Sequence, residues 1–421
     1  MNKRKKNIIL VVIILFILGI VYIHLTIYAT PKTRLQLKED YSEMKESRFR
    51  YYINLPIDYQ NPKAGKYKGF YLLSPHFFEN KNITFFLTDG QMELVNTNTN
   101  FSFFEEILGG SSYVLMSVRG QSPTFFPEIY KNGNTDLLMA MKLLNSDQQV
   151  EDIEQIRLEM IRKKLLTKED KINIFGASGA GILAQQYVSK YGKNVNRAIL
   201  ESTGAPDISQ KMHIQYSPNF KEFNPQANIL LETILEKRKL NLASLSNILY
   251  QIGRNKTNPK TEQLKILQDL QNNGCFLSYQ FKPMMNLSFL NYLIKSPKEI
   301  APRVRWFELV GYDLLRYNPK KGINLLYEIS DKTLSDFVNH CKLNQYQPKK
   351  FSIKRNFDGE VLIIKGTEDV VFGDSINKEI QKSYPNAKLI FFKDGHRMQE
   401  NKNLYKKARL DFLQNGFKNV K

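Results

Sequence analysis

One short stretch of the sequence has the residue types and spacing of a nucleophilic serine. Residues 171–181 read KINIFGASGAG, in which an apolar run leads into small residues around Ser178 and a helical pattern follows. A strand, a sharp turn and a helix in this order form a nucleophile elbow, which strains the serine backbone and exposes its hydroxyl. The usual spacing is G-x-S-x-G, whereas here Ala180 takes the place of the last glycine and Gly181 follows it. The spacing of a phosphate-binding glycine turn is absent, so the elbow is the favoured interpretation.

A serine hydroxyl needs a base to accept its proton and an acid to orient that base. After a nucleophile elbow, the acid and then the histidine follow the serine along the chain, and both are expected on loops at strand ends. Asp369 comes shortly after the apolar run 361–364, and His396 comes shortly after the run 388–392. The pattern therefore predicts acyl transfer through a nucleophile Ser178, a base His396 and an orienting acid Asp369.

Other residues compete for the places of the acid and the base. Glu368 and Asp374 are alternatives to Asp369, which is favoured because the two valines after it can anchor its loop to the core. The other four histidines lie in the first apolar segment, before the elbow or in a long later insertion: His24, His76, His213 and His340.

An oxyanion formed during acyl transfer needs two backbone N–H donors. One is expected from Gly179, the residue after the nucleophile, and the other from the loop that follows the apolar run 83–87. That loop, residues 88–92, reads TDGQM, and Gly90 or Gln91 is the candidate donor. An ordinary Asp-Gly turn is the alternative interpretation of the same residues.

Short apolar runs supply the elements that would position these residues. Strands are predicted over 49–55, 70–73, 83–87, 113–118, 171–175, 197–200, 361–364 and 388–392. Helices are predicted from Val150 onward, over 180–191 and over 404–413, because apolar residues there recur at steps of three and four. Strands that alternate with helices predict an α/β fold, with a mostly parallel sheet flanked by helices.

The chain divides into segments that differ in residue composition and in the pattern of apolar residues. Residues 206–347 are rich in Leu, Lys, Asn and Ile and lack strand-length alternation, which predicts a helical insertion. The predicted organisation is an N-terminal anchor or signal peptide, a linker, the first part of the core, a helical cap and the second part of the core, over 1–30, 31–47, 48–205, 206–350 and 351–421.

The N-terminal segment predicts the compartment. Residues 8–25 are almost entirely apolar and follow four basic residues at positions 3–6, which is the pattern of a transmembrane helix with a cytoplasmic N-terminus. We expect contact with the membrane through residues 8–29 and a catalytic domain outside the cytoplasm. A cleaved signal peptide with a cut near Ala29 is the alternative, and would yield a secreted protein.

Composition excludes several classes of protein. The chain of 421 residues is 42% hydrophobic, with 22 Gly, 16 Pro and 2 Cys, so it is neither disordered nor fibrous nor a disulfide scaffold. The net charge of +20 is spread along the chain without a nucleic-acid-binding motif, so no nucleic-acid partner is predicted. Cys275 and Cys341 lack the neighbours of a metal site and could be paired or simply buried. No metal or organic cofactor is implied.

Three further stretches carry a resemblance to a known family. Residues 55–59 read LPIDY with Pro62 after them, residues 117–122 read SVRGQS, and residues 151–157 read EDIEQIR. With the elbow, they make the chain similar to the α/β-hydrolase superfamily, and within it to the proline iminopeptidase and tripeptidyl aminopeptidase family of serine peptidases. The family usually has H-G-G-P-G where residues 88–92 stand, so this loop departs from its pattern.

The resemblance implies a serine aminopeptidase that releases residues from the N-terminus of peptides. It also implies that the insertion is a helical cap whose carboxylates bind the free amino group of the substrate, for which Glu308 and Asp313 are candidates. A carboxylesterase or lipase acting on small esters is the alternative if the pocket is apolar. A catalytically silent hydrolase fold that serves as a binding module is the alternative from another class.

Overall fold

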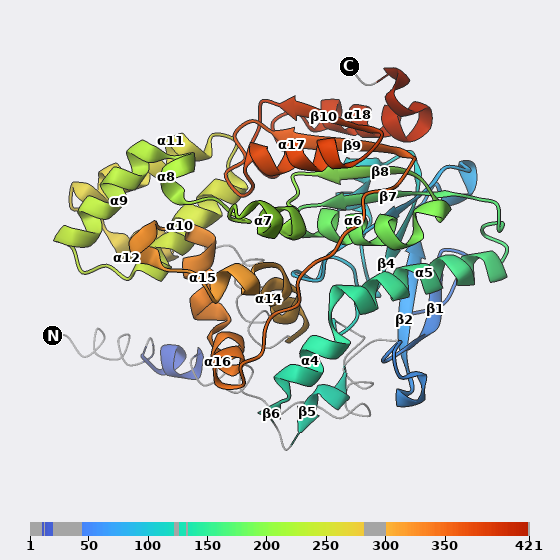
Figure 1. Ribbon diagram of the computed structural model, residues 1–421, viewed down its shortest axis with the longest axis horizontal. Coiled ribbons are helices and arrows are strands. Elements are labelled where there is room, and N and C mark those ends of the chain that lie inside the picture. The colour runs from blue at the N-terminus through green and yellow to red at the C-terminus, as the bar shows by residue number, and fades with distance from the viewer. Residues whose placement is uncertain are drawn as a thin grey trace.

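A central sheet of eight strands organises the protein (Figure 1). The computed structural model describes residues 11, 13–19, 44–121, 126–131, 134–281 and 300–419. In spatial order the strands are β1, β2, β4, β3, β7, β8, β9 and β10. Their bounds are Arg50–Pro56 for β1, Lys66–Leu73 for β2, Ile83–Phe86 for β3, Ser112–Met116 for β4, Ile172–Ala177 for β7, Val195–Glu201 for β8, Glu360–Gly366 for β9 and Ala387–Phe392 for β10.

The sheet is mostly parallel. Strand β2 is antiparallel to both of its neighbours, whereas β4, β3, β7, β8, β9 and β10 pair in parallel. Central strands such as β3 and β9 are buried on both faces, which explains why they read as continuous apolar runs rather than as alternating patterns. Each of the eight predicted apolar runs lies within one of these strands, apart from one or two residues at some ends.

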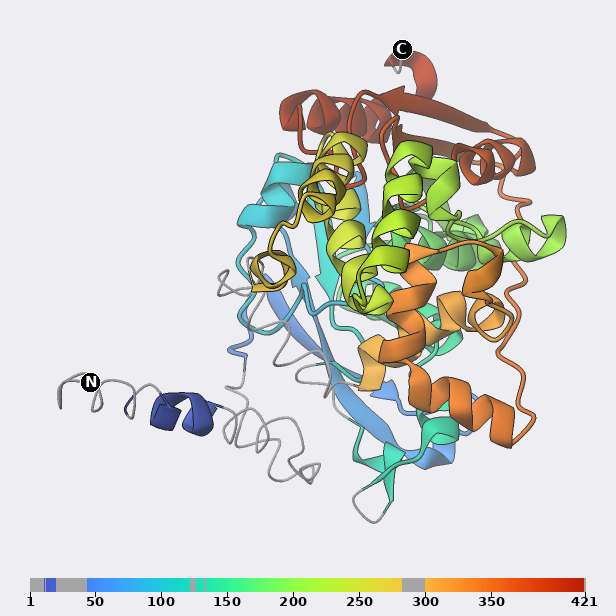
Figure 2. The ribbon, with the colours of Figure 1, turned by 90° about the vertical axis from the view of Figure 1, so that its left-hand side faces the viewer.

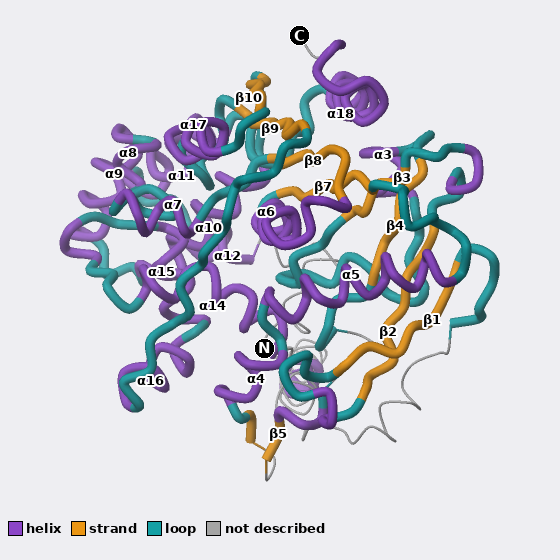
Figure 3. Tube along the Cα trace, turned by 45° about the vertical axis from the view of Figure 1, so that its right-hand side comes forward, coloured by secondary structure: helices purple, strands orange, loops and turns teal. Residues whose placement is uncertain are grey.

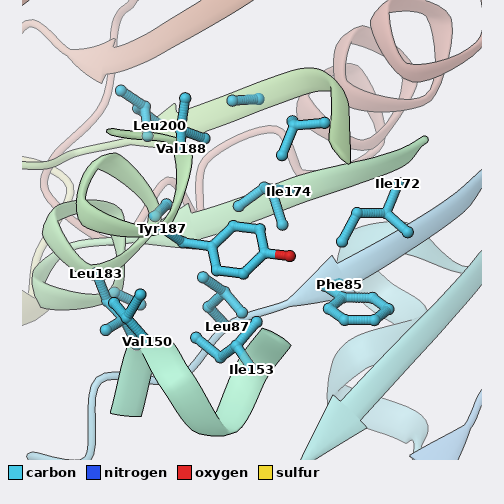
Figure 4. Close-up of a cluster of buried hydrophobic side chains, with 14 of the residues drawn as sticks. Phe85, Leu87, Val150, Ile153, Ile172, Ile174, Leu183, Tyr187, Val188 and Leu200 are labelled. Atoms are coloured by element: carbon cyan, nitrogen blue, oxygen red, sulfur yellow. The ribbon is translucent and has the colours of Figure 1, made fainter. Parts of the chain in front are cut away.

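Helices cover both faces of the sheet (Figure 3). On one face, α5 (Ser146–Arg162), α6 (Gly179–Tyr191) and α17 (Asp374–Ser383) pack against the strands, and Figure 4 shows part of this core. On the other face lie α3 (Ser102–Leu108) and α18 (Lys402–Asn415), whose buried side chains share a cluster with the opposite sides of the strands. This sandwich holds the carboxyl ends of β7, β8, β9 and β10 in fixed relative positions.

A helical insertion joins β8 to β9, and its described residues contain no strand. It comprises α7 (Pro206–Met212), α8 (Phe220–Phe223), α9 (Pro225–Lys237), α10 (Leu242–Asn255), α11 (Pro259–Gln271), α12 (Phe276–Phe281), α14 (Ile300–Leu314), α15 (Leu325–Thr333) and α16 (Ser335–Leu343). These helices gather beside one end of the sheet (Figures 1 and 2). Residues 229–249 of the predicted insertion form parts of two helices, α9 and α10, because Asn241 caps the start of α10 by accepting a hydrogen bond from the Ser244 N–H.

A buried ion pair joins the three stretches on which the family resemblance rests. Arg119 donates from Nε to Asp152 Oδ2 at 2.7 Å and from Nη2 to Oδ1 at 3.0 Å. The hydroxyls of Tyr59 and Tyr67 donate to the same carboxylate at 2.9 and 2.8 Å. These contacts tie the end of β1, the loop after β4 and helix α5 together, which gives the motif residues a structural role. Ser122, at the end of its stretch, lies outside the described residues.

A short helical segment, α4 (Leu137–Leu143), and a small hairpin of β5 (Tyr130–Lys131) and β6 (Asn134–Thr135) lie between β4 and α5. Near the N-terminus, residues 13–18 are helical and exposed. Over the described parts of the chain, no helix combines enough length with enough apolar character to cross a bilayer. Most of the anchor predicted over residues 8–25, and the linker up to residue 43, lie outside the described residues.

Candidate active site

Ser178 stands at the sharp turn between β7 and α6. Its φ of +54° lies in a region that a residue with a side chain rarely adopts, so the backbone is strained there. The turn is held on both sides, because the Ser178 N–H donates to the Glu201 carbonyl at 2.8 Å and the Thr203 hydroxyl donates to the Ser178 carbonyl at 2.7 Å. The strained serine is only partly buried, as the elbow interpretation requires.

Close backbone approaches explain which small residues the elbow needs. A β-carbon on Gly176 would lie 2.3 Å from the Ala180 carbonyl oxygen, and one on Gly181 would lie 2.5 Å from Thr203 Oγ1. Position 180 tolerates the methyl group of alanine, which is buried in the core below the sheet. The departure from G-x-S-x-G is therefore compatible with the turn.

His396 lies between Ser178 and Asp369. Its Nε2 is 3.2 Å from Ser178 Oγ, and its Nδ1 is 3.1 Å from Asp369 Oδ1. His396 is buried, and its imidazole packs against the Phe372 ring, with 5.7 Å between the ring centroids. With Nδ1–H donating to the carboxylate, Nε2 is left as the acceptor that faces the serine hydroxyl.

Asp369 is held ionised by a buried lysine. Burial by itself would raise the pKa of Asp369, but the Lys365 ammonium 3.4 Å away, His396 and the Val371 N–H lower it well below its ordinary value. Lys365 is fully buried and also donates to the Phe372 carbonyl at 2.9 Å. The structure thus adds to the site a cation that the sequence analysis missed.

The two competing acids lie elsewhere. Glu368 is 3.6 Å from the Lys260 ammonium, and the half-exposed Asp374 is 3.5 Å from Lys365. Of the three candidate acids, Asp369 is the one in contact with His396 among the described residues. A cavity of about 520 Å³ opens against the far side of Asp369, but neither Ser178 nor His396 lines it.

The predicted oxyanion loop lies against the elbow. Gly90 has a φ of +84°, and a β-carbon there would lie 2.9 Å from Val118 Cγ1, so glycine is required. The Gln91 N–H donates to Asp89 Oδ1 at 3.1 Å within the loop. A β-carbon on Gly179 would lie 1.9 Å from Asp89 Oδ2. The Asp89 carboxylate therefore rests on the Gly179 backbone, one residue from the nucleophile.

Protein partners already surround the two carboxylates predicted to bind substrate. Glu308 accepts hydrogen bonds from the Ser146 N–H at 3.0 Å, from the Ser146 hydroxyl and from Arg305. Asp313 accepts from the Tyr327 hydroxyl at 2.8 Å and from the Tyr216 N–H at 3.3 Å. Burial raises the pKa of Asp313. Both side chains stabilise the packing of the insertion, and binding of substrate by either stays a prediction.

Arg305 is a second buried cation that the sequence analysis missed. Its Nε donates to the Asp89 carbonyl at 2.9 Å, its Nη1 to Glu308, and its Nη2 has no hydrogen-bond partner among the described residues. Burial lowers the pKa of Arg305 to about 10. The arginine fixes the backbone of the loop 88–92 to helix α14.

The described residues contain no group of three or more side chains suited to hold a metal ion. Cys275 is exposed and Cys341 is buried, and both are free thiols.

The three candidate residues follow β7, β9 and β10, in the chain order serine, acid, histidine. Parallel strands end at the same edge of a sheet, which brings the three loops together. An elbow serine on such a sheet, with the acid and the histidine in this order, is characteristic of one superfamily. The chain has the α/β-hydrolase fold.

Comparisons with known proteins identify no close relative. No family model matches the sequence, and no curated protein matches it. Among solved structures, a serine hydrolase from Cycloclasticus zankles is similar at 13% identity and a TM-score of 0.43, over 88% of this chain and 100% of that one. An esterase from Exiguobacterium antarcticum is similar at 14% identity and a TM-score of 0.43, over 83% and 96%. These values are too low to carry either activity to this chain.

Proposed function

We propose that this protein is a serine hydrolase that works through an acyl-enzyme on Ser178. The observation that carries the proposal is the continuous set of contacts from the strained Ser178 hydroxyl through His396 to Asp369, at 3.2 and 3.1 Å. In the first step, His396 Nε2 accepts the hydroxyl proton while Ser178 Oγ attacks the substrate carbonyl. The same imidazole then protonates the leaving group, and water releases the acyl group in a second cycle.

An oxyanion site and a buried ion pair would support this chemistry. The backbone amides of Gly179 and Gly90 are the proposed oxyanion donors, because the Gln91 amide is already bonded to Asp89. Asp369 would stabilise the imidazolium that forms in each step, and Lys365 keeps that carboxyl ionised.

The proposed activity is an aminopeptidase that acts on short peptides. It is supported by the resemblance of residues 55–59, 117–122 and 151–157 to that family, and by the presence of a carboxylate beside the nucleophile, which an enzyme for neutral esters would not need. A carboxylesterase is the outcome to be distinguished by experiment.

The test compares the wild type with Ser178→Ala on three substrates: a peptide anilide with a free amino group, its N-acetylated form and a neutral p-nitrophenyl ester. Ser375→Ala, on the exposed start of α17, is the matched control. We expect turnover in the wild type and the control and its loss in Ser178→Ala, with the free-amine peptide cleaved fastest. Unchanged turnover in Ser178→Ala would refute the mechanism. Cleavage of the ester alone would make the protein an esterase, and no cleavage of any substrate would favour a binding module.

We also propose that the N-terminal segment anchors the chain in a membrane with the hydrolase domain outside the cytoplasm. The support is the apolar sequence 8–25 after basic residues 3–6, together with the exposed apolar side chains of residues 13–18. The test is the mass and location of the mature chain. A full-length chain in the membrane fraction is expected, and a soluble chain shortened by about 29 residues would favour a cleaved signal peptide.

A further inference from the structure

The position of Asp89 raises an electrostatic problem for the reaction. Its carboxylate rests on Gly179, whose N–H is a proposed oxyanion donor, and Gln91 holds it there through its backbone N–H and its side-chain amide. A transition state that places a negative oxygen on the Gly179 N–H would therefore form beside an existing negative charge. Two negative charges that lie close together in a partly buried site repel each other strongly.

Among the described residues, one buried arginine offsets this charge, and it is shared with a second carboxylate. Arg305 on α14 contacts the backbone carbonyl of Asp89, but its guanidinium also binds Glu308. Tyr216, from the loop after α7, faces the site as a neutral phenol, because burial raises its pKa well above the ordinary value. Arg254 on α10 contacts Met92 Sδ at 3.7 Å. Asp89 and Glu308 therefore share one guanidinium, that of Arg305.

A cationic substrate would neutralise the charge of Asp89. In a peptide with a free N-terminus, the α-ammonium nitrogen is two bonds from the carbonyl carbon of the first residue, so it must lie close to Ser178 when that carbonyl is attacked. The Asp89 carboxylate packs against Gly179, the residue after the nucleophile, and among the described residues it accepts hydrogen bonds from Gln91 of its own loop. Glu308 and Asp313 are instead engaged by other elements of the protein.

We propose that Asp89 binds the α-ammonium group of the substrate's N-terminal residue, and that this ion pair is required for rapid acylation. The inference rests on the proposed serine hydrolase function and deepens it. The substrate class is a peptide or amide with a protonated amine next to the scissile carbonyl. In the bound complex the ammonium offsets the Asp89 charge, so the oxyanion forms in an environment without net repulsion.

The test measures kcat and KM for the full chain as wild type, Asp89→Asn and Glu93→Gln. Asparagine keeps the shape of Asp89 and its acceptor for the Gln91 N–H, while Glu93→Gln removes one negative charge just after the same loop, four residues from Asp89. Substrates are the free-amine peptide anilide, its N-acetylated form and the neutral ester. Asp89→Asn is expected to lower kcat/KM for the free-amine peptide about 10- to 100-fold, through kcat as well as KM, and to raise hydrolysis of the neutral ester. In Glu93→Gln, the ratio of kcat/KM for the free-amine peptide to kcat/KM for the N-acetylated peptide should equal that of the wild type.

A pH profile adds a readout that a structural role for Asp89 would not change. In the wild type, kcat/KM for the free-amine peptide should fall as pH rises through about 8, the ordinary pKa of an α-amino group, because the neutral amine cannot pair with Asp89. For the ester, kcat/KM should show no such fall. For the free-amine peptide, the fall should be smaller in Asp89→Asn than in the wild type.

The outcomes distinguish a failure of the role proposed for Asp89 from a failure of the proposed serine hydrolase function. Equal losses on all three substrates in Asp89→Asn, or a wild type that prefers the N-acetylated peptide, would overturn the inference. Ser178-dependent cleavage of the ester with neither peptide cleaved would also overturn it, but would leave the serine hydrolase proposal intact. Activity that survives in Ser178→Ala would overturn the proposed function itself.

Discussion

The ion pair between Lys365 and Asp369 gives the account its sharpest prediction about stability. Both side chains are completely buried, and the ammonium is 3.4 Å from Oδ2. At an effective dielectric constant of about 20, two unit charges at this distance attract by about 5 kcal/mol. Lys365→Met keeps most of the side-chain volume but leaves the carboxylate buried without this partner. Removal of one member of a buried pair typically costs about 3–5 kcal/mol, and we expect a loss in that range.

A double-mutant cycle measures this pair directly. The unfolding free energies of the wild type, Lys365→Met, Asp369→Asn and the double variant are determined in urea, followed by circular dichroism and by the fluorescence of the single tryptophan, Trp306. We expect the double variant to be less destabilised than the sum of the single variants, with an interaction energy of about 1–3 kcal/mol. Additive changes, or a Lys365→Met protein as stable as the wild type, would show that this ion pair does not stabilise the folded protein.

The pH dependence of the same variants follows from the sign of the shift. The pKa of Asp369 is lowered in the folded protein, so its ionised form adds stability above its ordinary value of 3.8, and this contribution is lost as the pH falls further. In Lys365→Met the lysine no longer offsets the effect of burial, so we expect the folded-state pKa of Asp369 to lie above that of the wild type. The stability gap between the wild type and Lys365→Met should therefore be largest near neutral pH and narrow as the pH falls below 4.

Three further predictions concern the elbow and the two cysteines. Gly179→Ala would place a methyl group 1.9 Å from Asp89 Oδ2, so we expect at least about a 100-fold loss of kcat/KM while circular dichroism stays native; an active variant would contradict the close packing of the loop on the elbow. Ser178→Gly should be more stable in urea than Ser178→Ala by about 1 kcal/mol, because glycine relieves the strain at φ +54°; equal stabilities would argue against a strained elbow. Burial raises the pKa of Cys341 to about 11, so a thiol reagent should label Cys275 alone in the folded chain and both cysteines in urea; labelling of neither in urea would indicate a disulfide.

Local sequence was sufficient for the elements that build the sheet and for the three residues brought together at its edge. The strands around Ser178, Asp369 and His396 are short apolar runs with small or polar residues after them, and both features are visible in one segment at a time. The order of the three residues along the chain then restricts which acid and which histidine can meet the serine.

Local sequence patterns could not predict the contacts between distant segments of the chain. Glu308 meets Ser146 across 162 residues of sequence, so nothing near Glu308 indicates that its carboxylate is occupied. Lys365 follows an apolar run, where a lysine normally marks the exposed end of a strand, yet here the chain turns back and buries it under Asp369. The close approach of Asp89 to Gly179 likewise depends on how two loops pack, which the sequence of neither loop specifies.

Covalent labelling is the most direct test of Ser178 as the nucleophile. The full chain is treated with an organophosphate that reacts with activated serines, digested, and analysed by mass spectrometry beside Ser178→Ala. If Ser178 is the nucleophile, we expect one adduct per chain on Ser178, loss of activity in proportion to labelling, and no adduct in the variant. Complete labelling of another residue with loss of activity, or full activity after Ser178 is modified, would contradict this role of Ser178.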